Sequence, residues 1–191
     1  MTRRTLGTMI ALAAAALLAA VVVGALDTAV HNRGLPLSDA SIIRRQAAQK
    51  HLDPALIAAV IYAESRFEPR PSAAGAQGLM QILPETAYYL AHLSGGHAFT
   101  AADLATPQIN VAYGSYYLRY LLDHYGGDEM LAVAAYNGGL ANVDRWVTRA
   151  HAEGGALTVG AIPFPETREY VQRVLNAQHQ YRSTYRRELG L

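Results

Sequence analysis

Apolar residues recur three and four residues apart along most of the chain, and no alternating run is longer than a few residues. Helical spacing of this kind predicts amphipathic or buried helices, and Gly or Pro residues separate one segment from the next. The sequence therefore predicts an all-α or α-dominated α+β fold. Helices are expected over residues 39–50, 54–64, from 79, and over 84–93, 110–125, 129–137, 140–151 and 166–187, with loops over 67–78 and 154–165.

Two helix starts carry recognisable capping residues. Ser38 precedes the segment 39–50, and serine is a favoured N-cap because its hydroxyl can accept a bond from a free backbone N–H. Asp53 is followed by Pro54, which suits the first helical position because that residue needs no N–H partner. The sequence thus predicts side-chain caps at Ser38 and Asp53.

The first 26 residues form a segment of a different kind. Arg3 and Arg4 precede an uncharged run over residues 5–26, about the 20 residues that span a bilayer. A plain signal peptide has an apolar core of only about 7–15 residues, so the pattern favours an uncleaved anchor with the arginines on the cytoplasmic side. Residues 23–25 still offer a cleavage site. Both alternatives place the rest of the chain in the cell envelope, either membrane-anchored with an extracytoplasmic domain or secreted or periplasmic.

Residues 27–37 contain Gly34 and Pro36 and are interpreted as a linker, so the main folded domain is expected over residues 38–191. The chain has no cysteine, which excludes disulfides and a lipid-modified thiol. Roughly 160 residues can nevertheless bury a sufficient apolar core without such cross-links.

Charge and motif content exclude several classes of function. Without residues 1–26 the chain keeps 14 of its 16 Lys and Arg against 15 Asp and Glu, which argues against nucleic acid as a partner. The seven histidines are scattered, with no pair at metal-ligand spacing. No glycine-rich phosphate loop follows a strand. We therefore expect no metal and no cofactor.

Glu64 is notable because it ends an apolar helical run, residues 60–63. Burial raises the pKa of a carboxyl above its usual value of about 4.3, and the negative end of a helix acts in the same direction. A raised pKa is what a general acid needs. Taken alone, however, such a glutamate is more often exposed or paired with a neighbouring arginine, here Arg66 or Arg70.

Three further stretches accompany this glutamate. Residues 78–81 read GLMQ, residues 135–139 read AYNGG, and residues 166–171 read ETREYV. Each has an ordinary explanation by itself: a helix start, a helix end with a capping amide, and a helix whose tyrosine faces the core. Their order and spacing carry more information than any one of them.

Together, ES at residues 64–65, GLMQ, AYNGG and ETxxYV resemble the catalytic domain of the bacterial soluble-type lytic transglycosylases. The resemblance covers residues 39–182. It implies a lysozyme-like helical domain with a substrate groove, related to goose-type lysozyme. It also implies that the partner is the glycan strand of peptidoglycan; it says nothing about protein partners.

The resemblance assigns the family's functional residues to this chain. The single catalytic acid and base corresponds to Glu64. Ser72 is the nearest serine in a loop slightly shorter than the family's, and Glu166 matches an acid with a structural role at a helix start. The phenol of Tyr170 is expected to approach Glu64. Substrate binding is expected from Ser65, Ser72, Gly78, Met80, Gln81, Tyr136, Asn137 and Tyr170.

The family chemistry requires only one carboxyl group. The resemblance implies that Glu64 protonates the oxygen leaving N-acetylmuramic acid and then accepts the proton of the 6-hydroxyl, which closes a 1,6-anhydro ring. Ordinary glycosidases use two carboxylates. A lysozyme-like hydrolase is therefore the first alternative. It would need a second acid or a positioned water near Glu64; Glu68 is the nearest acid in sequence but is expected to face solvent. A peptidoglycan-binding protein without activity and a small membrane protein that binds partners are further alternatives.

Overall fold

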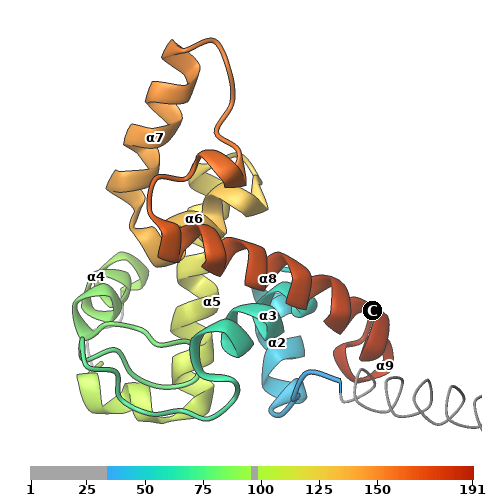
Figure 1. Cartoon of the computed structure of the whole chain (residues 1–191). Helices are drawn as coiled ribbons and strands as arrows, with labels where there is room; N and C mark the ends of the chain where they lie inside the picture. Colours follow the sequence, from blue (N-terminus) through green and yellow to red (C-terminus); the bar gives the residue numbers. More distant parts are fainter. Residues whose placement is uncertain (1–33, 96–98) are drawn as a thin grey trace, which may run out of the picture. The chain divides into compact units, whose positions relative to one another are not determined.

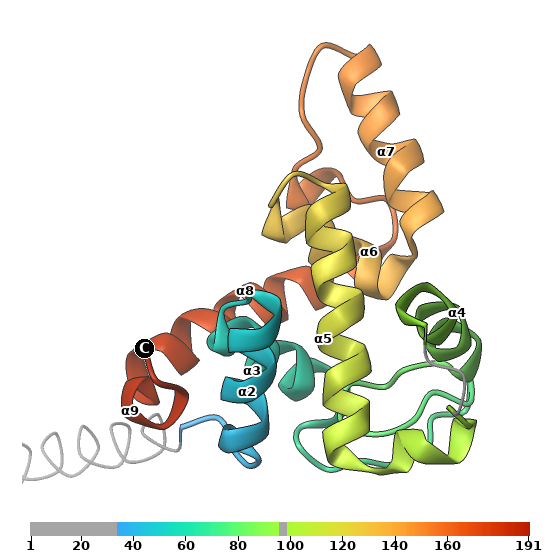
Figure 2. The ribbon, with the colours of Figure 1, turned by 180° about the vertical axis from the view of Figure 1, so that it is seen from behind.

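Eight α-helices and two short 3₁₀-helices make up the regular structure of residues 34–95 and 99–191, which are the residues that the computed structural model describes. Within them the only bridge is an isolated pair, Gln77 and Ile82. The all-α prediction is confirmed. The elements, shown in Figures 1 and 2, are α2 (Ala40–Lys50), α3 (Pro54–Ser65), α4 (Pro84–Ser94), η1 (Ala101–Ala105), α5 (Pro107–His124), α6 (Glu129–Gly138), α7 (Leu140–Ala152), η2 (Val159–Ala161), α8 (Pro165–Thr184) and α9 (Arg186–Leu189).

Most helix boundaries lie within a few residues of those predicted, but three differ. Helix α5 begins at Pro107, three residues before the expected start. The last predicted helix is divided, because the chain leaves helical geometry at Tyr185 before α9 begins. The helix expected from residue 79 is absent: residues 78–81 form a turn, in which Gly78 and Gln81 have positive φ.

The two predicted caps had different outcomes. The Asp53 carboxylate accepts a bond of 3.0 Å from the N–H of Ala55, and Pro54 follows at the first helical position, as predicted. The cap at Ser38 was wrong. Its hydroxyl donates instead to the carboxylate of Asp39, at 2.9 Å, and Asp39 occupies the N-cap position without a side-chain bond to the helix. The helix begins at Ala40, one residue later than predicted, so Asp39 and not Ser38 occupies the position before its first turn.

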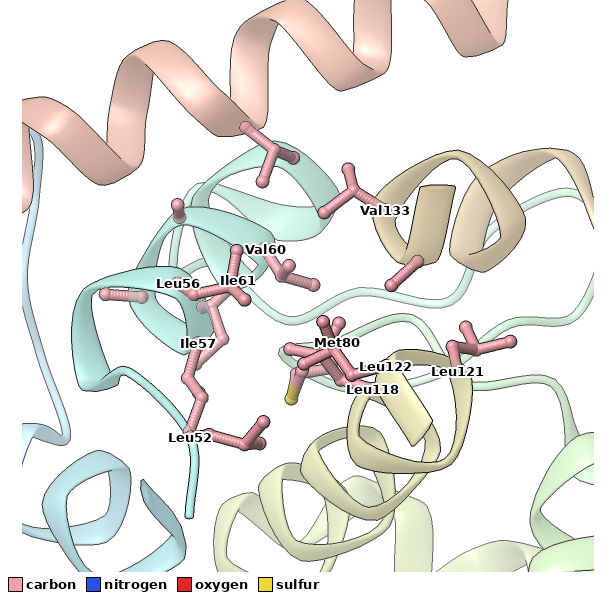
Figure 3. Packing of buried hydrophobic residues seen from close by; sticks show 14 of the residues in the cluster. Leu52, Leu56, Ile57, Val60, Ile61, Met80, Leu118, Leu121, Leu122 and Val133 are labelled. Atoms are coloured by element: carbon pink, nitrogen blue, oxygen red, sulfur yellow. The ribbon is translucent and has the colours of Figure 1, made fainter. Parts of the chain in front are cut away.

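Helix α3 lies at the centre of the packing. Its residues 55–61 are all buried, and it contacts both α2 and α8. Figure 3 shows Leu56, Val60 and Ile61 among side chains of the same core, with Leu118 of α5 and Val133 of α6 nearby. A helix that is apolar on every side must be surrounded. The carboxyl-terminal end of α3, which carries Glu64, is therefore held firmly in place.

The chain enters this core through residues 35–37, the end of the expected linker. The Tyr181 hydroxyl donates to the carbonyl of Pro36 at 2.6 Å, and the Tyr185 hydroxyl donates to that of Leu35 at 2.7 Å. These residues are thus attached to the end of α8.

The predicted membrane segment, residues 5–26, lies outside the described residues. Among residues 34–95 and 99–191, no helix is long and apolar enough to cross a membrane.

Candidate active site

Glu64 occupies the last turn of α3, where the chain changes direction. Arg66 and Phe67 both have positive φ, 54° and 64°, so the backbone leaves the helix axis immediately after Ser65. The Glu64 side chain is half-buried. Its Oε1 accepts a hydrogen bond of 2.6 Å from the hydroxyl of Tyr170, which lies in α8, 106 positions further along the chain. The structure therefore brings together the two residues that the sequence places far apart.

Burial raises the pKa of Glu64 from its usual 4.5 to about 7. The hydrogen bond from Tyr170 and the positive charge of Arg173 act in the opposite direction, since both favour the ionised carboxylate. The desolvation effect is the larger. Glu64 is consequently divided between its acid and carboxylate forms near neutral pH, so it can either give or accept a proton.

Two tyrosines close to Glu64 remain protonated donors. Burial, followed by the field of Glu64, raises the phenol pKa of both Tyr170 and Tyr136 well above 10. Tyr170 is only 4% exposed. Tyr136, near the end of α6, donates its hydroxyl proton to the carbonyl of Met80 at 3.0 Å. Tyr136 therefore links α6 to the 78–81 turn.

The 78–81 turn is organised by Asn110, a residue of α5 that sequence reasoning did not select. The Oδ1 atom of Asn110 accepts from the N–H of Met80 at 2.8 Å. Its Nδ2 donates to the carbonyls of Gln77, at 2.8 Å, and Leu104, at 3.0 Å. Asn110 is completely buried. A polar amide at a position where the helical repeat expects an apolar residue was the only signal in the sequence.

Gly78 is required for this arrangement by two independent constraints. Its φ is +76°, a conformation that other residues rarely adopt. A Cβ atom here would lie 2.1 Å from Nδ2 of Asn110 and 2.6 Å from the carbonyl oxygen of Leu104. The glycine therefore allows the backbone and Asn110 to approach closely.

Two of the predicted binding residues have buried side chains, and the side chain of a third bonds to backbone carbonyls. Ser65 is 5% exposed, and its hydroxyl faces the carbonyls of Leu79, at 2.8 Å, and Ile61, at 3.2 Å. Met80 is completely buried. The side-chain amide of Gln81 donates to the carbonyls of Arg70 and Gly78, both at 2.8 Å. These side-chain positions favour structural roles for Ser65 and Met80 over the substrate contacts that we expected.

The remaining predicted residues lie in two other places. The Ser72 Oγ accepts from the N–H of Ala76 at 3.0 Å and so stabilises the loop after α3. Asn137 is exposed at the end of α6, and its Oδ1 accepts from the Thr167 hydroxyl at 2.8 Å. Asn137 and Thr167 line a cavity of about 350 Å³. Glu166 also lines it, exposed in the first turn of α8.

A second carboxylate does not contribute to the environment of Glu64 in the described part of the chain. The two groups that lower its pKa are Tyr170 and Arg173, and no acid raises it. Glu68, the nearest acid in sequence, has a side chain 77% exposed and lies 3.9 Å from Arg70 at the surface. Within residues 34–95 and 99–191, no three His, Cys, Asp or Glu side chains are grouped so that they could hold a metal.

Comparison with known proteins identifies the family. The model of the transglycosylase SLT domain matches residues 41–158. The chain belongs to this family. The soluble lytic murein transglycosylase of Escherichia coli is 32% identical over 150 residues, which cover 77% of this chain and 23% of that protein. A transglycosylase of Enterobacteria phage PRD1 is 37% identical over 110 residues, covering 57% of this chain and 37% of the phage protein.

Solved structures of SLT proteins share this fold. The 70 kDa soluble lytic transglycosylase of Escherichia coli superposes with a TM-score of 0.72 at 30% identity, over 79% of this chain and 25% of that one. Its complex with bulgecin A gives the same TM-score at 31% identity, with the same coverage. The chain therefore spans about a quarter of the length of these SLT relatives.

Proposed function

We propose that this SLT domain is a lytic murein transglycosylase that cleaves the bond between N-acetylmuramic acid and N-acetylglucosamine in peptidoglycan without water. The observation that carries the proposal is the single carboxyl group at the site. Glu64 is half-buried, has a pKa of about 7, and accepts a hydrogen bond from Tyr170. One group that can be both acid and base is what this reaction requires. The names of the relatives support the same substrate.

The first step uses Glu64 as an acid. Its proton moves to the oxygen that bridges the two sugars, and the bond from that oxygen to the anomeric carbon of N-acetylmuramic acid breaks. The electron pair of that bond stays with the departing oxygen. The neighbouring acetamido carbonyl of the muramic acid supports the positive charge that develops at the anomeric carbon. The raised pKa of Glu64 supplies the protonated form near neutral pH.

The second step uses the same residue as a base. The Glu64 carboxylate accepts the proton of the 6-hydroxyl of the sugar, and that oxygen bonds to the anomeric carbon. The product is a 1,6-anhydro ring, and Glu64 is protonated again for the next cycle. The reaction needs no activated water and no enzyme nucleophile. This is consistent with the pKa of Glu64, which no second carboxylate raises in the described part of the chain.

Tyr170 has a defined part in this scheme. Its hydroxyl donates to Glu64 at 2.6 Å and stabilises the carboxylate form more than the acid form. It therefore favours proton loss in the first step and orients the carboxylate for the second. We propose Gly78, Gln81, Tyr136, Asn137 and Ser72 as the surfaces that position the sugar, with Ser65 and Met80 acting through the backbone that they hold.

A muramidase that uses water remains the second candidate, because the same scaffold could position a water molecule instead. The location of the nearest acid weakens it. The Glu68 side chain is exposed and lies beside Arg70 at the surface, whereas the inverting mechanism needs a carboxylate about 6.5–9.5 Å from the acid. A binding protein without activity has no need of a glutamate whose pKa lies near neutrality.

We further propose that residues 5–26 anchor the domain in the cell envelope, with a cleaved signal peptide as the other outcome. A reporter fused after Leu191 that is active outside the cytoplasm supports export. Protein recovered in soluble form without the first 25 or so residues selects the cleaved form.

Digestion of purified peptidoglycan tests the proposed function directly. Mass spectrometry of the products separates anhydro ends from reducing ends, because hydrolysis adds one water to each cleaved bond. We expect anhydro ends from the wild-type protein. Reducing ends would establish the hydrolase, and intact glycan strands would leave a binding protein.

A further inference from the structure

One edge of helix α8 adjoins the candidate active site and carries a cation. Glu166, Tyr170 and Arg173 are four and three residues apart, so they lie along the same edge of the helix. Glu166 lines the cavity of about 350 Å³ that Asn137 also lines. Tyr170, one turn further, donates its hydroxyl proton to Glu64. Arg173 follows after another turn, and its side chain is exposed.

The charge of Arg173 acts on both central groups of the site. It lowers the pKa of Glu64, and it opposes the rise in the pKa of Tyr170. A cation affects a carboxyl through space only when it lies nearby, because the interaction falls with distance and is screened by salt. In the described part of the chain, Arg173 is the only cation that contributes to the pKa of Glu64.

Arg173 has no acid partner within residues 34–95 and 99–191. Arg70, Arg119 and Arg182 each pair with an acid. Glu169, four residues before Arg173, is the acid closest to it in sequence on α8, and the two form no ion pair. A guanidinium group presents its N–H donors in a planar fork that matches a carboxylate. Arg173 is thus available to an anionic group of a ligand.

The proposed substrate carries such a group. N-acetylmuramic acid has a lactyl ether, and the carboxyl group of this ether belongs to the same sugar as the bond that Glu64 would cleave. In strands without peptides this carboxyl is a free anion. In intact strands it is joined by an amide bond to a stem peptide, which has carboxylates of its own. Both forms of the strand therefore offer a carboxylate attached to the reacting sugar.

We propose that Arg173 binds a carboxylate carried by the muramic acid, and that it makes the domain prefer anionic strands over neutral ones. The inference rests on the proposed function, because that function places muramic acid at Glu64. Glu64 transfers the protons, whereas Arg173 selects the substrate. An ion pair at an exposed position is screened by salt, so the preference should decline as the ionic strength rises.

Three forms of the glycan strand provide the test. The first carries stem peptides, the second is free of peptides and keeps the lactyl carboxylate, and in the third this carboxylate is converted into a neutral methylamide. Binding is measured with full-length Glu64→Gln protein, so that neither cleavage nor titration of Glu64 contributes. Arg173→Gln is added to this protein, and Arg187→Gln, which removes an exposed arginine of α9, is the control for the loss of one charge.

We expect Arg173→Gln to weaken the binding of anionic strands about fivefold, the upper end for an exposed ion pair, and to leave the neutral strands unchanged. A loss on peptide-free strands assigns the lactyl carboxylate, and a loss confined to peptide-bearing strands assigns a carboxylate of the stem. Arg173→Lys keeps the charge and should recover part of the affinity. Arg187→Gln should bind all three forms as its parent does.

Two results would overturn the inference: unchanged binding of every strand by Arg173→Gln, or an equal loss on anionic and neutral strands. The second result would show that Arg173 supports the site without recognising a charge. The proposed function is decided separately, by the sugar ends that the wild-type protein releases. Reducing ends would refute the transglycosylase reaction, and the binding comparison would still decide the role of Arg173.

Discussion

The two sides of the candidate site are held by different forces. We call the ends of α3 and α6 and the start of α8, which carry Glu64, Tyr136 and Tyr170, the helical side. The segment 66–83, which includes the 78–81 turn, is the turn side. On the helical side, residues 55–61 of α3 are completely buried among apolar neighbours. On the turn side the backbone is held by hydrogen bonds from side chains, chiefly those of Asn110 and Gln81.

This difference predicts different consequences of mutation on the two sides. Apolar burial fixes the direction of α3, so the Glu64 side chain can be changed at its carboxyl group without loss of packing. Burial of polar groups is favourable only while their hydrogen bonds are complete. A single substitution on the turn side should therefore cost stability, whereas one on the helical side should cost activity.

Glu64→Gln is expected to have the largest effect. It keeps the shape of the side chain and its acceptor for Tyr170, but it removes the group that transfers the proton. General acid and base catalysis contributes about 10²- to 10⁴-fold, so kcat on purified glycan strands should fall by at least that range. Below pH 4.5, where the wild-type carboxyl is protonated, the melting temperature should change little. Glu68→Gln, an exposed acid four residues away, is the control and should retain full activity. Unfolding of Glu64→Gln would contradict the difference between the two sides.

Asn110→Asp should have the next largest effect, and on stability. The carboxylate can still accept from Met80, but it cannot donate to the carbonyls of Gln77 and Leu104. Two carbonyl acceptors lose their donor and a buried negative charge is placed against them, which should cost about 3 kcal/mol or more in the free energy of unfolding. Urea denaturation measures the change. A variant as stable as the wild type would show that the turn does not depend on Asn110.

Tyr170→Phe is expected to have a smaller effect than either of these variants, because it removes one oxygen and keeps the ring in place. Loss of the hydrogen bond to Glu64 should reduce kcat about tenfold, which corresponds to roughly 1.4 kcal/mol in the activation free energy. If Tyr170 served only to pack the core, turnover would be nearly intact while stability fell by about 1 kcal/mol. Measuring both quantities on one preparation separates the two roles.

The pH dependence of kcat/KM should follow the pKa of Glu64 and shift in Tyr170→Phe. With a pKa of about 7 for Glu64, kcat/KM should fall as pH rises above 7, because the acid form is lost. The Tyr170 bond lowers that pKa, so Tyr170→Phe should move the alkaline limb to higher pH. An alkaline limb that stays at the same pH or moves to lower pH would contradict the contribution of Tyr170.

The same pKa has a consequence for stability. Folding raises the pKa of Glu64 from 4.5 to about 7, so the folded state holds the proton more tightly than the unfolded state. The free energy of unfolding of the wild type, relative to Glu64→Gln, should therefore fall as pH rises from 4.5 to 7 and stay constant above. Urea titrations of both proteins at several pH values measure this change.

The sequence by itself determined the helical class, most helix bounds, the cap at Asp53 and the position of Glu64 at the end of an apolar helix. These features depend on local spacing and on residue types that act within a few positions of one another. The order of the motifs also identified the family without any structure. Predictions from local patterns were wrong where hydrogen bonds from a distant residue determine the backbone conformation. Residues 78–81 form a turn instead of a helix start because Asn110, some thirty residues later, supplies bonds that a local helix would have supplied.

Only the tertiary structure decided how the site residues are used. Ser65 adjoins Glu64 in the chain but points inward to the carbonyl of Leu79, since successive helical residues face different directions. The contact between Tyr170 and Glu64 spans 106 positions and exists because α8 packs against α3. The raised pKa of Glu64 has the same origin. It depends on how much water the packed helices exclude from the carboxyl group, and no property of a residue by itself fixes that quantity.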